Sequence, residues 1–306
     1  MTGARAARSS PALRLAAPIV SAAIVMAGLA ATASAKDYAA WGTAVSAESL
    51  PGTSSELNTA ANDGCPIEAP DGLSLYTATN RLGGPGGIDI WVAHRASTDA
   101  PFGAPVVLPA PINSAADDFC PTPVRGKGLL FVSTRVAVGA CGGADIYFAR
   151  LNPATGWTEA VNLGCQVNSA AGEAGPSYVE AGGGYLYFSS GPDIYASPQL
   201  ADGSFGAAAA VAELNSTDGD FRPNVRKDGL EIVFDSNRGG TLGGQDIYVA
   251  TRERTSDPWS LPVNAGTAIN TSANETRASF SWDATRLYFG RTPGPEGGTD
   301  IFVSTR

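Results

Sequence analysis

Residues 112–121 read "INSAADDFCP", and the order of their polar residues recurs along the chain. An Asn-Ser pair is followed by an acid five positions after the Asn, and by a Pro three positions after the acid. The same order occurs four more times, with Thr for Ser in two copies and with Ala278 for Pro in the last. The acids of this turn motif are Asp63, Asp118, Glu173, Asp220 and Glu275. Such a repeat indicates one structural unit that is used several times.

Three kinds of short phrase recur in step with the turn motif. Examples are "DIYFAR" (145–150), "GYLYFSS" (184–190) and "WSLPV" (259–263). They are rich in β-branched and aromatic residues and are bounded by Gly, Pro, Asn or Asp, which is typical of strands. The Asn of the turn motif stands at positions 58, 113, 168, 215 and 270. A period of about fifty residues with several strands per unit predicts a β-propeller.

The phrases at the two ends of the chain predict how the ring closes. Residues 41–45, "WGTAV", form an outer-strand phrase with no blade before it, and residues 300–306, "DIFVSTR", have no outer strand after them. We expect the N-terminal strand to complete the last blade, because an open ring would expose an unpaired edge. The sequence therefore predicts an all-β fold over residues 36–306, a five-bladed propeller of four-stranded antiparallel blades.

Residues 1–35 have a basic start, an apolar middle and the small-residue end Ala33-Ser34-Ala35. This pattern predicts a secretory signal peptide; the alternative is an uncleaved anchor, since the apolar run approaches the length that spans a bilayer. Cleavage would remove three arginines and no acid, so the net charge of −9 would become −12. A chain this acidic repels phosphate backbones. We expect a periplasmic or secreted monomer with no membrane span after cleavage and no nucleic-acid partner.

Four cysteines in an exported chain predict two disulfides, for which three connectivities exist. Cys141 precedes the third strand of blade two and Cys165 ends the fourth, so antiparallel neighbours bring them together. Cys65 and Cys120 hold the same repeat position on neighbouring inner strands. We predict the pairs Cys141–Cys165 and Cys65–Cys120. With one histidine and two methionines in the chain, we expect no metal centre and no cofactor.

The five acids of the turn motif have two possible roles. They could bind a cation or act as acid and base on a sugar, or they could accept hydrogen bonds within the turn and pair with an arginine. Arginines recur at the end of the second strand in four blades: Arg81, Arg135, Arg238 and Arg291. We therefore interpret Asp63, Asp118, Asp220 and Glu275 as structural acids. Blade three has no such arginine, which leaves Glu173 without the partner of its equivalents.

Departures from the repeat are the better candidates for ligand contact. They are the unpartnered acid of blade three and polar or aromatic residues on the inner strands, which would line the axis. The candidate binding residues are Glu68, Glu173, Tyr178, Arg222, Asn224, Arg226 and Arg277. For each charged residue the alternative is an ion pair between blades.

Two stretches resemble a known repeat family. Residues 65–81, "CPIEAPDGLSLYTATNR", and 222–240, "RPNVRKDGLEIVFDSNRGG", are similar to the WD40-like, PD40-type repeats of TolB-like propellers. Ala69 stands where that family often has Ser, and Asp283-Ala284 where Asp-Gly is usual. The resemblance implies the propeller fold, and such folds serve many functions. We expect a recognition scaffold for a protein, peptide or glycan. The alternative is a five-bladed glycan hydrolase with axial carboxylates, for which the sequence assigns no catalytic residue.

Overall fold

The computed structural model describes residues 1–2 and 38–306. Apart from its first two residues, the predicted signal peptide (1–35) lies outside the described residues, as do Lys36 and Asp37. Residues 38–306 form strands, turns and two short 3-10 helices, η1 (Ala47–Ser49) and η2 (Ala181–Gly183). The all-β prediction is confirmed for this part of the chain.

The strands form five antiparallel sheets, one for each blade. Blade one contains β2 (Asp63–Glu68), β3 (Ser74–Thr79), β4 (Asp89–His94) and β5 (Val106–Val107). Blade two contains β6 (Asp118–Val124), β7 (Gly128–Ser133), β8 (Asp145–Asn152) and β10 (Val161–Asn162), with β9 (Gly156–Trp157) paired to the end of β8. Blade three contains β11 (Glu173–Val179), β12 (Tyr185–Ser190), β13 (Asp193–Pro198) and β14 (Ala209–Ala210). Blade four contains β15 (Asp220–Val225), β16 (Glu231–Ser236), β17 (Asp246–Thr251) and β18 (Val263–Asn264).

Blade five is assembled from both ends of the described chain. It contains β19 (Asn274–Phe280), β20 (Arg286–Thr292) and β21 (Asp300–Thr305), and its outer strand is β1 (Val45–Ser46). Val45 pairs with Val303 and Ser46 with Phe302. The predicted closure of the ring by the N-terminal strand is therefore confirmed. The paired strand is shorter than the 41–45 phrase suggests, and Gly42 adds a backbone hydrogen bond to Thr305.

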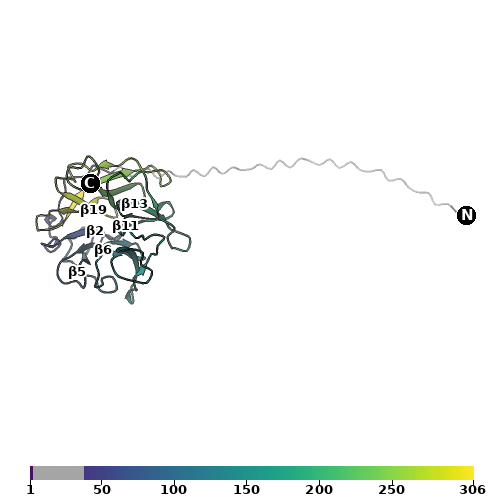
Figure 1. Ribbon diagram of the computed structural model, residues 1–306, viewed down its shortest axis with the longest axis horizontal. Helices are drawn as coiled ribbons and strands as arrows, with labels where there is room; N and C mark the ends of the chain where they lie inside the picture. Colours follow the sequence, from purple (N-terminus) through teal and green to yellow (C-terminus); the bar gives the residue numbers. More distant parts are fainter. Residues whose placement is uncertain (3–37) are drawn as a thin grey trace. The chain divides into compact units, whose positions relative to one another are not determined.

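The inner strands β2, β6, β11, β15 and β19 are neighbours around the axis. In Figure 1 the labelled strands β2, β6, β11 and β19 surround the centre of the ring, while β5 lies further out. Leucine, isoleucine, valine and aromatic side chains of the middle strands pack between adjacent blades as the hydrophobic core. Burying these side chains supplies the main favourable free energy of folding.

A β-bulge interrupts every inner strand two residues after its acid. The bulged residues are Cys65, Cys120, Gly175, Arg222 and Arg277, and their φ angles lie between 47° and 59°. A bulge bends its strand and changes the direction of a side chain. These five residues line the cavity on the propeller axis.

Two disulfides are present, and they are the two pairs that the sequence predicts. Cys141–Cys165 lies within blade two, with Cα atoms 5.6 Å apart. Cys65–Cys120 joins the inner strands of blades one and two, with Cα atoms 4.9 Å apart.

Candidate functional site

The Asn of the turn motif attaches each blade to the blade before it. Asn113 accepts a hydrogen bond from the backbone N of Ile90 (2.8 Å) and donates one to the backbone O of Ile90 (2.9 Å). Its side-chain amide thus pairs with the preceding third strand as a strand backbone would. The same two bonds join Asn58 to Ile301, Asn168 to Ile146, Asn215 to Ile194, and Asn270 to Ile247.

In blades one, two and four the acid of the motif closes the turn with one oxygen and binds an arginine with the other. Oδ2 of Asp118 accepts hydrogen bonds from the backbone N (2.6 Å) and Oγ (2.8 Å) of Ser114. Oδ1 of Asp118 lies 2.6 Å from the guanidinium of Arg135, which also donates to the backbone O of Ile112. Equivalent ion pairs are Asp63–Arg81, Asp220–Arg238 and Glu275–Arg291. All four acids are fully buried. These contacts indicate that the four acids have a structural role.

Blade three departs from this pattern. Oε1 of Glu173 accepts hydrogen bonds from the backbone N and Oγ of Ser169 (2.9 and 2.7 Å) and from Oγ of Ser190 (3.0 Å). Oε2 is buried and has no hydrogen-bond partner. Burial raises the pKa of Glu173 above its ordinary value, although the hydrogen bonds from Ser169 and Ser190 oppose that shift.

Four of the five interfaces between inner strands are joined by a side chain located four residues after the acid. Ser279 donates to the backbone O of Pro66 (2.6 Å), and Thr122 donates to the backbone O of Pro176. Ser177 accepts from the backbone N of Val225 (3.0 Å), and Asn224 accepts from that of Phe280 (3.0 Å). The fifth interface, between blades one and two, has Ile67 at this position, and there the Cys65–Cys120 disulfide makes the link. Asn224, a predicted binding residue, therefore has a structural contact.

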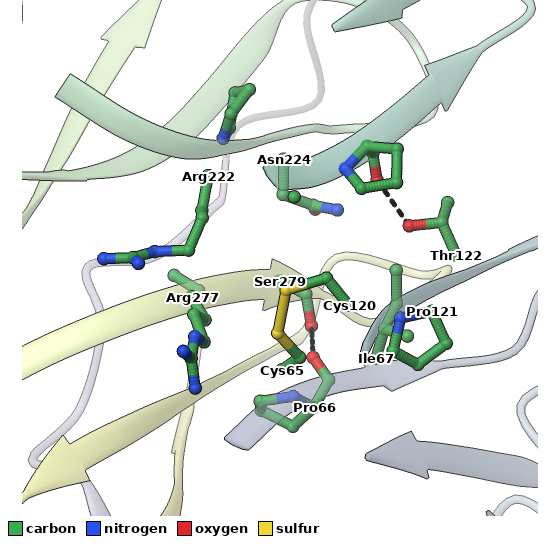
Figure 2. A pocket seen from close by; sticks show the side chains of 14 residues that line it. Cys65, Pro66, Ile67, Cys120, Pro121, Thr122, Arg222, Asn224, Arg277 and Ser279 are labelled. Atoms are coloured by element: carbon green, nitrogen blue, oxygen red, sulfur yellow. Dashed lines mark hydrogen bonds between the residues drawn. A yellow bond between two sulfur atoms is a disulfide. The ribbon is translucent and has the colours of Figure 1, made fainter. Parts of the chain in front are cut away.

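The axis is narrow at the level of these links. Figure 2 shows the disulfide on one side of the axial cavity and the side chains of Arg222 and Arg277 close together on another. The cavity volume is about 30 Å³, enough for one or a few water molecules. A second small cavity, of about 60 Å³, lies toward the C-terminal ends of the inner strands. Glu68, Tyr178 and Trp282 are among the residues that line it.

The axial arginines differ in their partners. Arg222 forms a buried ion pair with Asp235, with a distance of 3.0 Å from Nε to Oδ1. Arg277 makes no ion pair within the described part of the chain, and its Nε lacks a hydrogen-bond partner. Burial lowers the pKa of Arg277 to about 10, and repulsion from Arg222 adds to that effect.

Two other predicted binding residues lie in ion pairs near the ends of the inner strands. Glu68 contacts Arg95 (3.1 Å) and accepts a hydrogen bond from the Tyr288 hydroxyl (3.2 Å). Burial raises the pKa of Glu68 despite the charge of Arg95. Arg226 pairs with Asp228 (2.9 Å) and with the buried Glu231. Glu68, Arg222 and Arg226 thus lie in ion pairs, as the alternative to ligand binding predicted, but each of these partners belongs to the same blade and not to a neighbouring one.

A large pocket lies between blades two and three, with a volume of about 740 Å³. We call it the blade 2–3 cleft. Its lining includes three aromatic rings, those of Phe148, Tyr178 and Phe205, the last two in an edge-to-face contact. Two cationic residues, Lys127 and Arg150, and the amides of Asn162, Gln166 and Gln199 line it as well. The Tyr178 hydroxyl donates to Gln199 (2.7 Å), and the ammonium of Lys127 lies 5.0 Å from the Tyr178 ring centroid.

Of the predicted binding residues, only Tyr178 lines this cleft. Sequence reasoning placed the site on the axis and missed the rest of the lining, because strands and loops of two different blades supply it. One signal was present: blade three carries Gln199–Phe205, "QLADGSF", between its third and fourth strands. The backbone N of Leu200 donates a hydrogen bond to the backbone O of Ser204 (2.8 Å) there, which makes a compact loop.

Residues 38–306 contain no helix with the length and hydropathy needed to traverse a bilayer. In the same range no three His, Cys, Asp or Glu side chains are grouped so that they could hold a metal ion.

Comparison with known proteins reveals neither a matching family model nor a matching curated protein. Many solved structures share the fold. One is a thermostable family-43 glycoside hydrolase, with 12% identity, a TM-score of 0.54, and coverage of 83% of this chain and 91% of that one. Another is an α-L-arabinofuranosidase from Lactobacillus brevis, with 13% identity, a TM-score of 0.52, and coverage of 79% and 90%.

TolB from Acinetobacter baumannii is also similar, at 14% identity and a TM-score of 0.43, with coverage of 83% of this chain and 55% of that chain. At these identities the two hydrolases establish the fold alone: this chain is a five-bladed β-propeller. Membership of the PD40-type repeat family stays a prediction from the sequence.

Proposed function

We propose that this protein is an exported recognition propeller that binds a glycan in the blade 2–3 cleft and does not cleave it. The observation that carries the proposal is the composition of the cleft. Its volume of about 740 Å³ lies in the range typical of ligand pockets, and aromatic rings and amides line it together.

The side chains of the cleft suit a saccharide. The rings of Tyr178 and Phe205 can pack against the apolar face of a sugar ring, while Gln166 and Gln199 can exchange hydrogen bonds with its hydroxyls. Arg150 is exposed and has no ion pair among the described residues, so its guanidinium is available to an anionic substituent. The cleft would therefore favour an acidic glycan, even though the chain as a whole is acidic.

Glycan hydrolysis, the alternative, needs two carboxyl groups flanking one bond, usually about 5 to 9 Å apart. In the described residues the turn-motif acids are buried, and four of the five are paired with arginine. Glu68 and Asp235, which also lie near the axis, are paired with Arg95 and Arg222. The axial cavity has room for little more than water. These observations favour binding over hydrolysis.

Export is supported by the two disulfides, which persist in oxidising compartments. It agrees with the signal peptide predicted at residues 1–35. Mass spectrometry of the protein from the cell exterior or periplasm tests this part of the proposal, which predicts a mature N-terminus at or near Lys36.

Binding to an array of purified glycans, together with pull-down from envelope extracts, tests the function. Mature protein should retain a subset of glycans, and Tyr178→Ala or Phe205→Ala should reduce retention about tenfold or more, because stacking and hydrogen bonds are lost together. Trp282→Ala, which removes an aromatic ring at the axis, is the matched control and should leave binding unchanged. If only Trp282→Ala abolished binding, the site would lie on the axis and the proposal would be wrong. Capture of a protein instead of a glycan would also contradict it.

A further inference from the structure

Blade three preserves an arginine site but lacks the arginine. In blades two, four and five the guanidinium makes three kinds of contact: an ion pair to the turn acid, a hydrogen bond to a backbone O, and packing over two aromatic rings. Each kind of contact group is present in blade three. A cavity there is lined by Ser169 and Ser190, the two serines that bond Glu173, and no described side chain uses the three groups together.

The acceptor oxygen is the first of these groups. In blades one, two and four the oxygen of the acid that does not close the turn binds the arginine. In blade three the corresponding oxygen, Oε2 of Glu173, is buried and has no partner. Glu173 is only 2% exposed, so leaving this oxygen unpaired is costly.

The backbone acceptor is the second group. The arginines of the other four blades each donate to the backbone O of the residue before the turn Asn: Leu57, Ile112, Leu214 and Ile269. The blade-three counterpart is Val167. Val167 lines a cavity of about 360 Å³ together with Ser169 and Ser190, whose hydroxyls bond Oε1 of Glu173.

The aromatic pair is the third group. Arg291 lies 4.1 Å from the ring centroid of Phe302 and 5.6 Å from that of Phe289. Arg135 and Arg238 lie over the equivalent pairs, Phe131 with Tyr147 and Phe234 with Tyr248. Blade three retains the pair as Phe188 and Tyr195, which are stacked 6.2 Å apart. Both rings line the 360 Å³ cavity, and cations bind favourably over such rings.

Blade five shows why the space is open. Glu275 pairs in register with Arg291, and Glu173 pairs in the same register with Ser190. These are the two blades whose turn acid is Glu. Blades two and four also have a serine at this register, and there the arginine follows two residues later, at a position where blade three has Pro192. Blade three therefore has an arginine at neither position. We propose that the cavity of blade three binds a guanidinium or primary ammonium group of a ligand, in the place of the missing arginine.

The chemistry of the site determines what it accepts. A carboxylate oxygen and a carbonyl oxygen both accept hydrogen bonds, so the ligand group must donate, and the rings favour a cation. A guanidinium matches best, because its planar fork presents several donors while its flat face can stack on the rings. The group could belong to an arginine side chain of a peptide or to a free guanidino compound. This site shares Gln166 with the blade 2–3 cleft, but the groups invoked here are different ones, and the inference does not depend on the glycan proposal.

Methylguanidinium is the probe for the test, with isothermal titration calorimetry and thermal unfolding as readouts. Mature protein should bind it saturably with a millimolar dissociation constant, since one head group makes few contacts. Urea, a neutral analogue of similar shape, and NaCl at equal ionic strength should give no saturable effect. Comparison of L-arginine with Nα-acetyl-arginine amide then distinguishes a free amino acid from a peptide side chain.

Three variants make the test specific. Glu173→Gln removes the charge but keeps the side-chain shape, and it should weaken binding at least tenfold. Ser190→Arg should fill the cavity from within and abolish binding. Arg291→Ser converts blade five into a copy of blade three and should add a second binding site. Equal binding by wild type and Glu173→Gln, equal binding of urea, or no binding by wild type would each overturn the proposal. If Glu173→Gln proved unstable, the Ser190→Arg and Arg291→Ser titrations would decide.

Discussion

Ile67 of blade one occupies the repeat position of Thr122 in blade two, and it cannot make the hydrogen bond to the next blade that Thr122 makes. The Cys65–Cys120 disulfide lies at this same interface. The covalent link is therefore found where the inner strands have no polar side chain at the linking position. This relationship explains why a disulfide joins blades one and two and no other pair of described blades.

The first prediction is an energetic coupling between Ile67 and this disulfide. The double variant Cys65→Ala/Cys120→Ala should lose about 2–5 kcal/mol of unfolding free energy. In that background Ile67→Thr can donate to the backbone O of Pro121, so it should be more favourable by about 1 kcal/mol than in the wild-type protein. Chemical denaturation of the four proteins in the cycle measures the coupling. The same cycle with Cys141→Ala/Cys165→Ala is the control and should show none; equal coupling in both cycles would refute the idea.

The second prediction concerns ring closure. Deleting residues 36–46 removes β1 and leaves the edge of β21 unpaired. The truncated protein should aggregate or lose its single cooperative unfolding transition, as calorimetry and light scattering would show. A truncated protein with the unfolding temperature of the complete one would mean that this strand does not hold the ring closed.

The third prediction contrasts two turn acids. Asp118→Asn breaks a buried ion pair with Arg135 and should cost about 3–5 kcal/mol. The pKa of Glu173 is raised by burial, so the folded state holds this proton more tightly than the unfolded chain does. The stability from this group is thus present below the unfolded pKa of about 4.3 and is lost as pH rises through the folded pKa.

Glu173→Gln should therefore unfold at a higher temperature than wild type at pH 7, and this advantage should vanish toward pH 4. Thermal unfolding of wild type, Glu173→Gln and Asp118→Asn across that pH range is the measurement. A Glu173→Gln variant as damaged at pH 7 as Asp118→Asn would mean that both acids serve the same structural purpose.

The fourth prediction concerns the bulge of blade three. Gly175 has a φ of 57°, and a Cβ atom there would lie 2.6 Å from the Cα of Arg222. Gly203 also has a positive φ, of 87°, but a Cβ atom there would have no neighbour within 4 Å. Gly203→Ala should cost about 1 kcal/mol for backbone conformation alone, whereas Gly175→Ala should cost roughly 1–3 kcal/mol more. Equal losses in urea denaturation would show that the inner strands adjust freely.

Much of the fold follows from the sequence because the repeat reports it directly. The spacing of Asn58, Asn113 and their equivalents indicated the blades, and the outer-strand phrase at 41–45 indicated the closure. The strand pairings confirm both. Cys65 and Cys120, which share a repeat position, are paired as that position suggests.

Other features could not be read from the sequence, because they depend on contacts between blades. The inner strands begin at or just before the acid, and the pairing continues through the bulge that follows it. The sequence did not indicate that Arg222 pairs with Asp235, which lies on the next strand of the same blade. The blade 2–3 cleft combines Phe148 of one blade with Phe205 of another, and only packing brings them together.

The central claim, that the cleft binds a glycan and leaves it intact, is tested most directly by mass spectrometry of glycans retained on the mature protein. Each retained glycan is incubated with wild type and with Tyr178→Ala, and the molecular masses of the bound and the released glycans are measured. The account predicts that wild type returns every glycan at its original mass and that Tyr178→Ala retains little. Shortened glycans released by wild type, or full retention by Tyr178→Ala, would contradict it.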